Sequence, residues 1–198
     1  MSEPEHRVIL LRHGETAWSR ARRHTGRTDI PLTDVGIEEA RGARDRLAGA
    51  AIDRVLVSPL VRARQTCDLA GHGAGAVVDP RLMEWDYGAY EGRTSAEIDA
   101  ERPGWSLWTD GCPGGEDAAA VGARVDPVVA LCRDEPASWL LVAHGHVLRL
   151  FAARWCGLEP QAGALLQLGT AAICLLGFEH GVPGLRRWND DGAPASAW

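Results

Sequence analysis

The sequence predicts an α/β fold: a three-layer sandwich with a mostly parallel central sheet and helices on both of its faces. Short apolar runs of strand length alternate with segments of helical character along the chain. Several of these runs end directly before polar, reactive residues, as happens at the carboxyl ends of strands in a parallel sheet. The length of 198 residues suits one domain with a sizeable core, so residues 1–198 are expected to form a single domain.

Five strands are expected from apolar runs that are bounded by charged or turn-forming residues. They cover residues 8–11, 55–57, 76–78, 139–143 and 173–178. Helices are expected over residues 33–48, 116–132 and 147–155, with a short one near Ala96. Ser58 and Pro59 have the order of a helix N-cap followed by a first-turn proline, which places Arg62 near the start of another helix. From Asn189 onward the chain is polar and contains Gly and Pro, so a frayed tail is expected.

Composition and charge narrow the class of partner. The net charge of -6 argues against nucleic-acid binding, which needs a basic surface. The first apolar run, residues 8–11, is too short for a signal peptide or a membrane span, so a cytoplasmic protein without membrane contact is expected. All 21 basic residues are arginine, which excludes a lysine Schiff base and leaves local arginine clusters to hold an anionic small molecule.

The five cysteines show no spacing that is typical of zinc or redox sites. They are Cys67, Cys112, Cys132, Cys156 and Cys174. An odd number of well-separated cysteines favours buried thiols in a reducing compartment, which agrees with the cytoplasm.

Three groups of reactive residues follow expected strands. Arg12 and His13 follow the first strand, Ser58 to Arg62 the second, and His144 the fourth. Neutral imidazole is a good nucleophile near and above its reference pKa of ~6.5, and a phosphorylated imidazole can be hydrolysed in a second step. Arginines nearby would neutralise a phosphate monoester, since guanidinium groups match phosphate oxygens. Glu84 could then protonate the leaving oxygen.

Each of these residues also has a simpler interpretation. Arg62 could be an ordinary solvated residue, and spacing does not single out Glu84 among many acidic residues. His144 and His146 flank a glycine and could suggest a metal site, but they lack the partners and the helical spacing of the usual metal motifs. An apolar wall against a sugar could come from four aromatic residues, although core packing is their commoner use. These are Trp85, Tyr87, Trp105 and Trp108.

Four sequence blocks, read together, resemble the signature of the histidine phosphatase superfamily, which includes the cofactor-dependent phosphoglycerate mutases. The blocks are Leu11-Arg12-His13-Gly14-Glu15-Thr16, Pro31-Leu32-Thr33 with Gly36, Ser58-Pro59-Leu60-Val61-Arg62-Ala63-Arg64-Gln65-Thr66, and Ala143-His144-Gly145-His146. Their order and spacing agree over nearly the whole chain, which makes the signal specific. The resemblance implies a phosphoglycerate mutase-like fold and a site that needs neither metal nor cofactor.

The resemblance also implies a role for each matching position. His13 is expected to be the phosphorylated nucleophile and Glu84 the proton donor. The residues expected to bind the phosphate are Arg12, Arg62 and His144. Contacts with the rest of the substrate are expected from Ser19, Thr25, Gly26, Tyr87, Gly145 and His146. Ser19 departs from the asparagine of many relatives, and its shorter side chain has less reach toward the phosphate.

A narrower resemblance concerns Glu84-Trp85-Asp86-Tyr87-Gly88 and Trp108-Thr109-Asp110-Gly111-Cys112-Pro113. These segments are similar to the fungal sedoheptulose-1,7-bisphosphatases and to actinobacterial mutase-like acid phosphatases. Mutases share a longer insertion after the Glu, and this chain is short there. A metal-independent phosphomonoesterase that acts on a small phosphorylated metabolite, such as a sugar phosphate, is therefore expected. The alternatives are a phosphoglycerate mutase and a catalytically idle module that binds a phosphorylated ligand. The chain could also form a homodimer.

Overall fold

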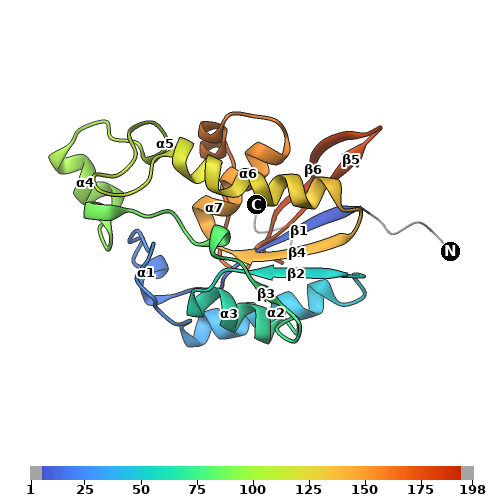
Figure 1. Ribbon diagram of the computed structural model, residues 1–198. Coiled ribbons are helices and arrows are strands. Elements are labelled where there is room, and N and C mark those ends of the chain that lie inside the picture. Colours follow the sequence, from blue (N-terminus) through green and yellow to red (C-terminus); the bar gives the residue numbers. More distant parts are fainter. Residues whose placement is uncertain (1–5, 193–198) are drawn as a thin grey trace.

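The computed structural model describes residues 6–192, which are built around one six-stranded sheet (Figure 1). In spatial order the strands are β3 (Val77–Val78), β2 (Arg54–Val57), β4 (Ser138–Ala143), β1 (Arg7–Arg12), β5 (Ile173–Glu179) and β6 (Val182–Asp190). The first four strands are parallel to one another, whereas β5 and β6 are antiparallel to their neighbours. The predicted mostly parallel sheet is confirmed.

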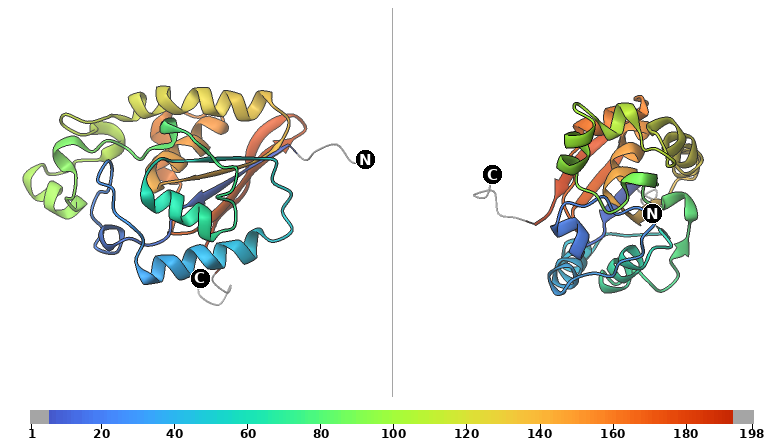
Figure 2. Two further views of the ribbon diagram at one scale, coloured as in Figure 1. Left: turned by 60° about the horizontal axis from the view of Figure 1, so that its bottom comes forward. Right: turned by 90° about the vertical axis from the view of Figure 1, so that its left-hand side faces the viewer.

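Helices cover both faces of the sheet, as predicted, because successive side chains of a strand point to opposite faces. In β1, Val8 and Leu10 belong to one apolar cluster, and Ile9 and Leu11 to another. The first cluster includes buried residues of α6 (Ala118–Asp134) and α7 (Gly145–Trp155), the second those of α2 (Asp34–Leu47) and α3 (Val61–Leu69). Figures 1 and 2 show these two helix pairs on opposite sides of the sheet.

Short elements fill the connections between strands and major helices. They are α1 (Ala17–Arg20), α4 (Ser95–Glu101), α5 (Leu107–Asp110) and the 3-10 turns η1 (Pro80–Leu82), η2 (Gly88–Tyr90) and η3 (Pro160–Leu165). In Figure 1, α1 and α4 lie beyond the same end of the sheet, the end toward which the parallel strands run. Among residues 6–192, no helix has the length and apolar character needed to cross a membrane.

Ser58 does not cap a helix, contrary to the sequence prediction. Helix α3 begins at Val61, and its N-cap residue Leu60 offers no side-chain hydrogen bond. The hydroxyl of Ser58 instead lies 2.7 Å from Nε2 of His144. Ser58 and Pro59 therefore follow strand β2 and bring the Ser58 hydroxyl to His144. Arg62 lies in the first turn of α3, as expected.

The edge strand β6 is absent from the sequence predictions because it contains Pro, Gly and two arginines. An edge strand tolerates these residues, since one of its sides needs no ladder hydrogen bonds. Predicted fraying from Asn189 is wrong for the last residues of β6. Asp190 pairs with Ile173, and the Asn189 side chain accepts the N–H of Gly169 at 2.7 Å. Residues 193–198 lie outside the described residues.

Candidate active site

Three strand ends bring residues that are distant in sequence next to one another. Because β4 lies between β1 and β2, the residues that follow these three strands are neighbours. The N–H of His13 donates to the carbonyl of Ala143 at 2.9 Å, and the N–H of Ser58 donates to that of Val142 at 3.0 Å. The ring centroids of His13 and His144 lie 5.1 Å apart.

A cavity of about 340 Å³ opens at these strand ends. Eight of the eleven predicted site residues line it: Arg12, His13, Ser19, Thr25, Glu84, Tyr87, Gly145 and His146. The other three, Gly26, Arg62 and His144, are buried and do not line its wall. We call this cavity the His13 cavity.

His13 is positioned as a neutral nucleophile. Its Nδ1 lies 2.7 Å from the carbonyl of Gly14, so Nδ1 carries the proton and Nε2 keeps its lone pair. Burial lowers the pKa of His13 well below its ordinary value of 6.5, and the positive charges of Arg62 and Arg12 lower it further. His13 is therefore neutral at pH 7, the form in which imidazole can attack phosphorus.

Arg12 has an N–H group without a partner in this cavity. Its Nη1 donates to the carbonyl of Leu168, but its buried Nε is bonded to no group of residues 6–192. Burial lowers the pKa of Arg12 and Glu84 opposes that shift, but an arginine stays charged at neutral pH. A buried donor without a partner is costly, and an anionic oxygen in the cavity would satisfy it.

Glu84 is held by three backbone N–H groups. Its Oε1 accepts those of Trp85 at 3.0 Å and Val147 at 2.9 Å, and its Oε2 accepts that of His146 at 3.0 Å. Each carboxylate oxygen offers about two lone pairs, so Oε1 is fully used while Oε2 retains one position. Glu84 thus braces the first turn of α7 and can still hold a proton on Oε2 inside the cavity.

A hydrogen bond links Tyr87 to His146. Burial raises the pKa of Tyr87 well above 10, so its hydroxyl keeps its proton, and this hydroxyl lies 2.6 Å from Nδ1 of His146. Burial also lowers the pKa of His146 well below 6.5, with Arg149 adding to the shift. His146 is therefore neutral at pH 7, and its ring is part of the cavity wall.

Arg62 and His144 form a buried layer behind the cavity. Arg62 donates from Nε to Nδ1 of His144 at 3.1 Å, and its terminal nitrogens donate to the carbonyls of Thr25, Gly26 and Thr28. Since Nδ1 of His144 accepts, its Nε2 carries the proton and donates to Ser58 Oγ. Both nitrogens of His144 are occupied in this arrangement, and Arg62 acts on His13 through its charge.

The remaining predicted contacts differ in how freely they face a ligand. Ser19 lines the cavity, but its hydroxyl accepts the N–H of Thr16 and donates to the Thr16 carbonyl in a capping box. Gly26 donates its N–H to Glu91 and gives its carbonyl to Arg62. Gly145 begins α7 with an N–H that no group within residues 6–192 accepts, so it can serve an anionic ligand.

Six lining residues are absent from the sequence predictions: Arg22, Arg23, His24, Ser95, Arg149 and Leu168. Helical periodicity could have found Arg149, which lies four residues after Gly145 and so shares its face of α7. The others come from loops, short turns and, for Ser95, the first position of the short helix α4, where sequence periodicity gives no orientation.

The expected aromatic wall forms only in part. Tyr87 lines the His13 cavity, whereas Trp85 and Trp108 belong to the apolar core and Trp105 packs at its edge. The suggested metal pair also separates, because His144 bonds Arg62 and Ser58 while His146 bonds Tyr87. Residues 6–192 contain no group of three or more His, Cys, Asp or Glu side chains that could hold a metal ion.

The chain belongs to the histidine phosphatase superfamily (branch 1), whose family model matches residues 8–191. It is 44% identical over 186 residues to an acid phosphatase of Mycobacterium tuberculosis, covering 92% of this chain and 91% of the relative. It is 36% identical over 188 residues to the sedoheptulose 1,7-bisphosphatase of Saccharomyces cerevisiae, covering 78% and 69%.

The structural comparison agrees with that membership. A mycobacterial glucosyl-3-phosphoglycerate phosphatase, solved with VO3, superposes with a TM-score of 0.82 at 33% identity. The match covers 93% of this chain and 98% of the other. The phosphoglycerate mutase-like fold implied by the sequence resemblance is confirmed.

Proposed function

We propose that this chain is a phosphomonoesterase that moves the phosphate of a small metabolite first to His13 and then to water. One observation carries the proposal: a neutral His13 with a free Nε2 shares a cavity with Arg12, whose buried Nε lacks a partner. A nucleophile beside an unsatisfied cationic donor fits an anionic, electrophilic group, and a phosphate monoester is both.

In the first step, Nε2 of His13 attacks phosphorus and the bond to the leaving oxygen breaks. Glu84 supplies the proton to that oxygen from Oε2, the carboxylate oxygen with a free lone-pair position. We assign the phosphoryl oxygens to residues that line the cavity and are fixed before the reaction: Arg12, the N–H of Gly145 and the ring of His146. Fixed donors of this kind stabilise charge without reorganisation, which is the main source of catalysis in phosphoryl transfer.

In the second step, water attacks the phosphohistidine. The ionised Glu84 removes a proton from the water, inorganic phosphate leaves, and His13 returns to its neutral form. Arg62 supports this cycle from behind, since its charge helps to keep His13 neutral, and it is itself hydrogen-bonded to His144. Neither step uses a metal ion or a cofactor.

Two features favour hydrolysis over the alternatives. A mutase must protect its phosphohistidine from water, but the mouth of the His13 cavity is bordered by the exposed residues Arg22 and Arg23. An idle binding module would need neither a nucleophile nor an acid, yet His13 and Glu84 line the same cavity. A sugar phosphate is the proposed class of substrate, and the cytoplasm, where the five free thiols would stay reduced, is the proposed compartment.

The test measures phosphate release from p-nitrophenyl phosphate and from a panel of sugar phosphates, sugar bisphosphates and phosphoglycerates, with EDTA present. We expect release that EDTA does not affect, and acid-labile, base-stable phosphate on the protein after rapid quench with labelled substrate. Activity that disappears with EDTA and returns with magnesium would overturn the metal-free mechanism. Transfer of phosphate between phosphoglycerates without net release would favour the mutase instead.

A further inference from the structure

Arg22 occupies a backbone position that normally belongs to glycine. It follows the C-cap of α1, and the helix ends in a Schellman motif: the N–H of Arg23 donates to the carbonyl of Trp18 at 2.9 Å, and that of Arg22 to Ser19 at 3.0 Å. Its φ of 55° lies in the left-handed region, which residues with a β-carbon rarely adopt. An arginine at such a place in a cavity wall points to a function for its side chain.

The Arg22 side chain is unpaired within the part of the chain that the structure describes. It lines the His13 cavity, and within residues 6–192 its guanidinium makes no hydrogen bond and no ion pair. The adjacent Arg23 differs, because it donates to the carbonyl of Gly92 and lies 3.7 Å from the carboxylate of Glu97. Of these two exposed arginines at the mouth, Arg22 is the one whose charge is not matched.

Arg149 supplies a second cation from another wall of the same cavity. Its Nε and one terminal nitrogen donate at 3.0 Å to the carbonyls of Gly163 and Ala164, and its guanidinium lies 4.7 Å from the ring centre of Trp108. These contacts fix the guanidinium plane, while its Nη1 has no partner among residues 6–192. Among residues 6–192, no carboxylate forms an ion pair with Arg149.

The charges of the cavity exceed what one phosphate requires. A phosphate monoester carries a charge of about -1.5 to -2 near pH 7. Arg12 in the wall and Arg62 behind it already supply two positive charges beside His13. Arg22 and Arg149 are therefore surplus to the phosphate that reacts, and Glu84 is the only carboxylate among the residues that line the cavity.

We propose that Arg22 and Arg149 form a second anion-binding position, so that the preferred substrate carries a carboxylate or a second phosphate besides the phosphate it loses. This inference rests on the proposed phosphatase activity and adds the substrate class to it. Arg149 provides a rigid contact from one wall, and the exposed Arg22 provides a second cation at the cavity mouth. An unmatched cation in the wall also disfavours substrates with a neutral tail, since its charge then stays unpaired.

The experiment compares kcat/KM for matched substrate pairs: fructose 1,6-bisphosphate against fructose 1-phosphate, and 3-phosphoglycerate against glycerol 3-phosphate. We expect the wild type to prefer the doubly anionic member of at least one pair by roughly tenfold or more, the effect of one charged hydrogen bond. The pair that shows the preference distinguishes a phosphate from a carboxylate. Arg22→Gly and Arg149→Gln should each reduce that preference severalfold or more.

Arg22→Gly also separates a functional from a structural role. Because glycine suits the left-handed position, this variant should melt at the same or a higher temperature while its preference falls. His180→Gly is the matched backbone control, since His180 has a φ of 50° in the turn between β5 and β6, and Arg41→Ala is the charge control on exposed α2. Both controls should keep the wild-type preference.

Two outcomes would overturn the second position: a wild type without preference in either pair, or variants that keep the full preference. A lower melting temperature of Arg22→Gly with unchanged preference would assign Arg22 a structural role. Hydrolysis of p-nitrophenyl phosphate by the wild type distinguishes these failures from failure of the proposed function. If that substrate is hydrolysed, only the second position is lost; if it is not, the phosphatase itself is in doubt.

Discussion

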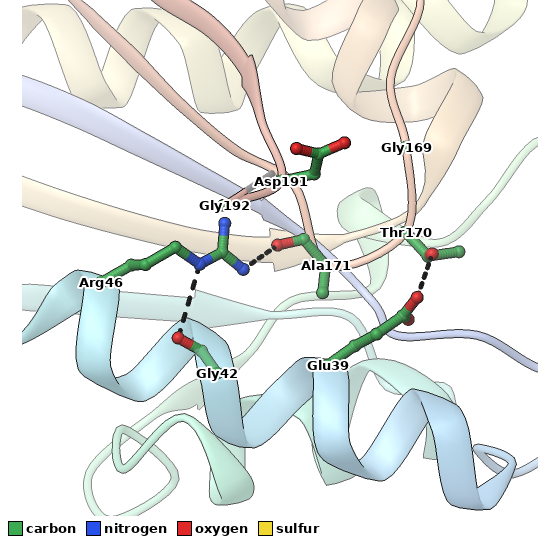
Figure 3. A pocket seen from close by; sticks show the side chains of 8 residues that line it. All are labelled: Glu39, Gly42, Arg46, Gly169, Thr170, Ala171, Asp191 and Gly192. Carbon is green, nitrogen blue, oxygen red and sulfur yellow. Dashed lines mark hydrogen bonds between the residues drawn. The ribbon is translucent and has the colours of Figure 1, made fainter. Parts of the chain in front are cut away.

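The His13 cavity differs from a larger cavity beside α2 in how its polar groups are paired. The larger cavity, of about 630 Å³, is lined by Glu39, Gly42, Arg46, Gly169, Thr170, Ala171, Asp191 and Gly192 (Figure 3). There, Glu39 accepts the Thr170 hydroxyl at 2.9 Å, and Arg46 donates to the Ala171 carbonyl at 2.8 Å. The smaller His13 cavity instead holds the unpartnered Nε of Arg12. A buried donor without a partner on a residue that lines the same cavity as a reactive histidine, rather than volume, therefore distinguishes the His13 cavity.

The larger cavity supports the smaller one from outside. The second carboxylate oxygen of Glu39 accepts the N–H of Glu15 at 2.7 Å, two residues after His13. The N–H of Ala171 donates to the carbonyl of His13 itself at 3.1 Å. These bonds hold the loop that follows β1, so the larger cavity is best explained as structural support for the nucleophile.

The largest expected effect is that of His13→Ala. Without Nε2 no phosphohistidine can form, so turnover should fall to background, and rapid quench should trap no phosphate on the protein. The side chain lies at the end of a strand against a cavity, so circular dichroism should show an intact fold. Wild-type turnover in this variant would show that the phosphate is transferred elsewhere.

Glu84→Gln tests the proton donor through the leaving group. A sugar alkoxide needs a proton as it leaves and a nitrophenolate needs it far less, so sugar phosphate hydrolysis should slow by about 10²–10⁴-fold. Formation of phosphohistidine from p-nitrophenyl phosphate should slow much less in single turnovers, which exclude the water step. The amide can accept hydrogen bonds from backbone N–H groups through only one of its two ends, so Glu84→Ala is needed to measure the loss of bracing.

An equal slowing with both substrates would contradict the acid role of Glu84. The role would then pass to Asp86 or Glu91, the nearest other carboxylates. Neither lines the His13 cavity: Asp86 lies 3.5 Å from Arg27, and Glu91 holds the N–H of Gly26. The geometry therefore favours Glu84 before the experiment is done.

Arg12 is expected to matter less than Glu84 in turnover but more in anion binding. Its charge meets phosphate in both the ground state and the transition state, so Arg12→Ala should weaken competitive inhibition by phosphate and vanadate as well as lower kcat/KM. The loss of a charged hydrogen bond is worth about 1.5–3 kcal/mol, or roughly 10–150-fold in the inhibition constant. Arg62→Ala should also weaken this inhibition and lower kcat/KM, because the charge of Arg62 acts on His13 and its Nε donates to His144. Unchanged inhibition constants in both variants would place the phosphate elsewhere.

The sequence predicted the residues that follow strands better than those that depend on loops. Arg12, His13 and His144 follow apolar runs, and parallel strands place such residues together. Little in the local sequence marks Glu84, because two of the three N–H groups that hold it belong to α7, some 60 residues later. Arg22 could not be predicted, because its position depends on a left-handed backbone that sequence patterns assign to glycine.

The buried histidines in and behind the wall of the His13 cavity should make the protein less stable in mild acid. Burial lowers the pKa of His13, His144 and His146 well below 6.5 in the folded state. Below about pH 6.5 the unfolded chain therefore binds protons that the folded chain does not. The free energy of unfolding should be constant above that pH and fall by about 1.4 kcal/mol per histidine for each further unit.

Urea unfolding between about pH 7.5 and pH 5.0 measures this slope. The window lies above the ordinary pKa values of carboxylates, so histidines dominate it. His146→Gln should reduce the slope by the contribution of one histidine. A free energy of unfolding that does not change across the window would show that these rings bind protons as readily in the folded state as in the unfolded chain, contrary to their lowered pKa values.

The smallest effect is expected at the larger cavity, from Arg46→Ala. The guanidinium of Arg46 donates to the carbonyls of Ala171 and Asp190 and, at 3.4 Å, to that of Gly42. Net hydrogen bonds of this kind contribute about 0.5–1.5 kcal/mol each, so loss of the two shorter ones should lower the free energy of unfolding by roughly 1–3 kcal/mol. Because no group of this cavity faces the substrate, kcat/KM should stay within about twofold of wild type. The result would confirm that a cavity with paired polar groups serves stability. If turnover instead fell strongly while stability stayed unchanged, the larger cavity would take part in function. The pairing of polar groups would then not distinguish the two cavities.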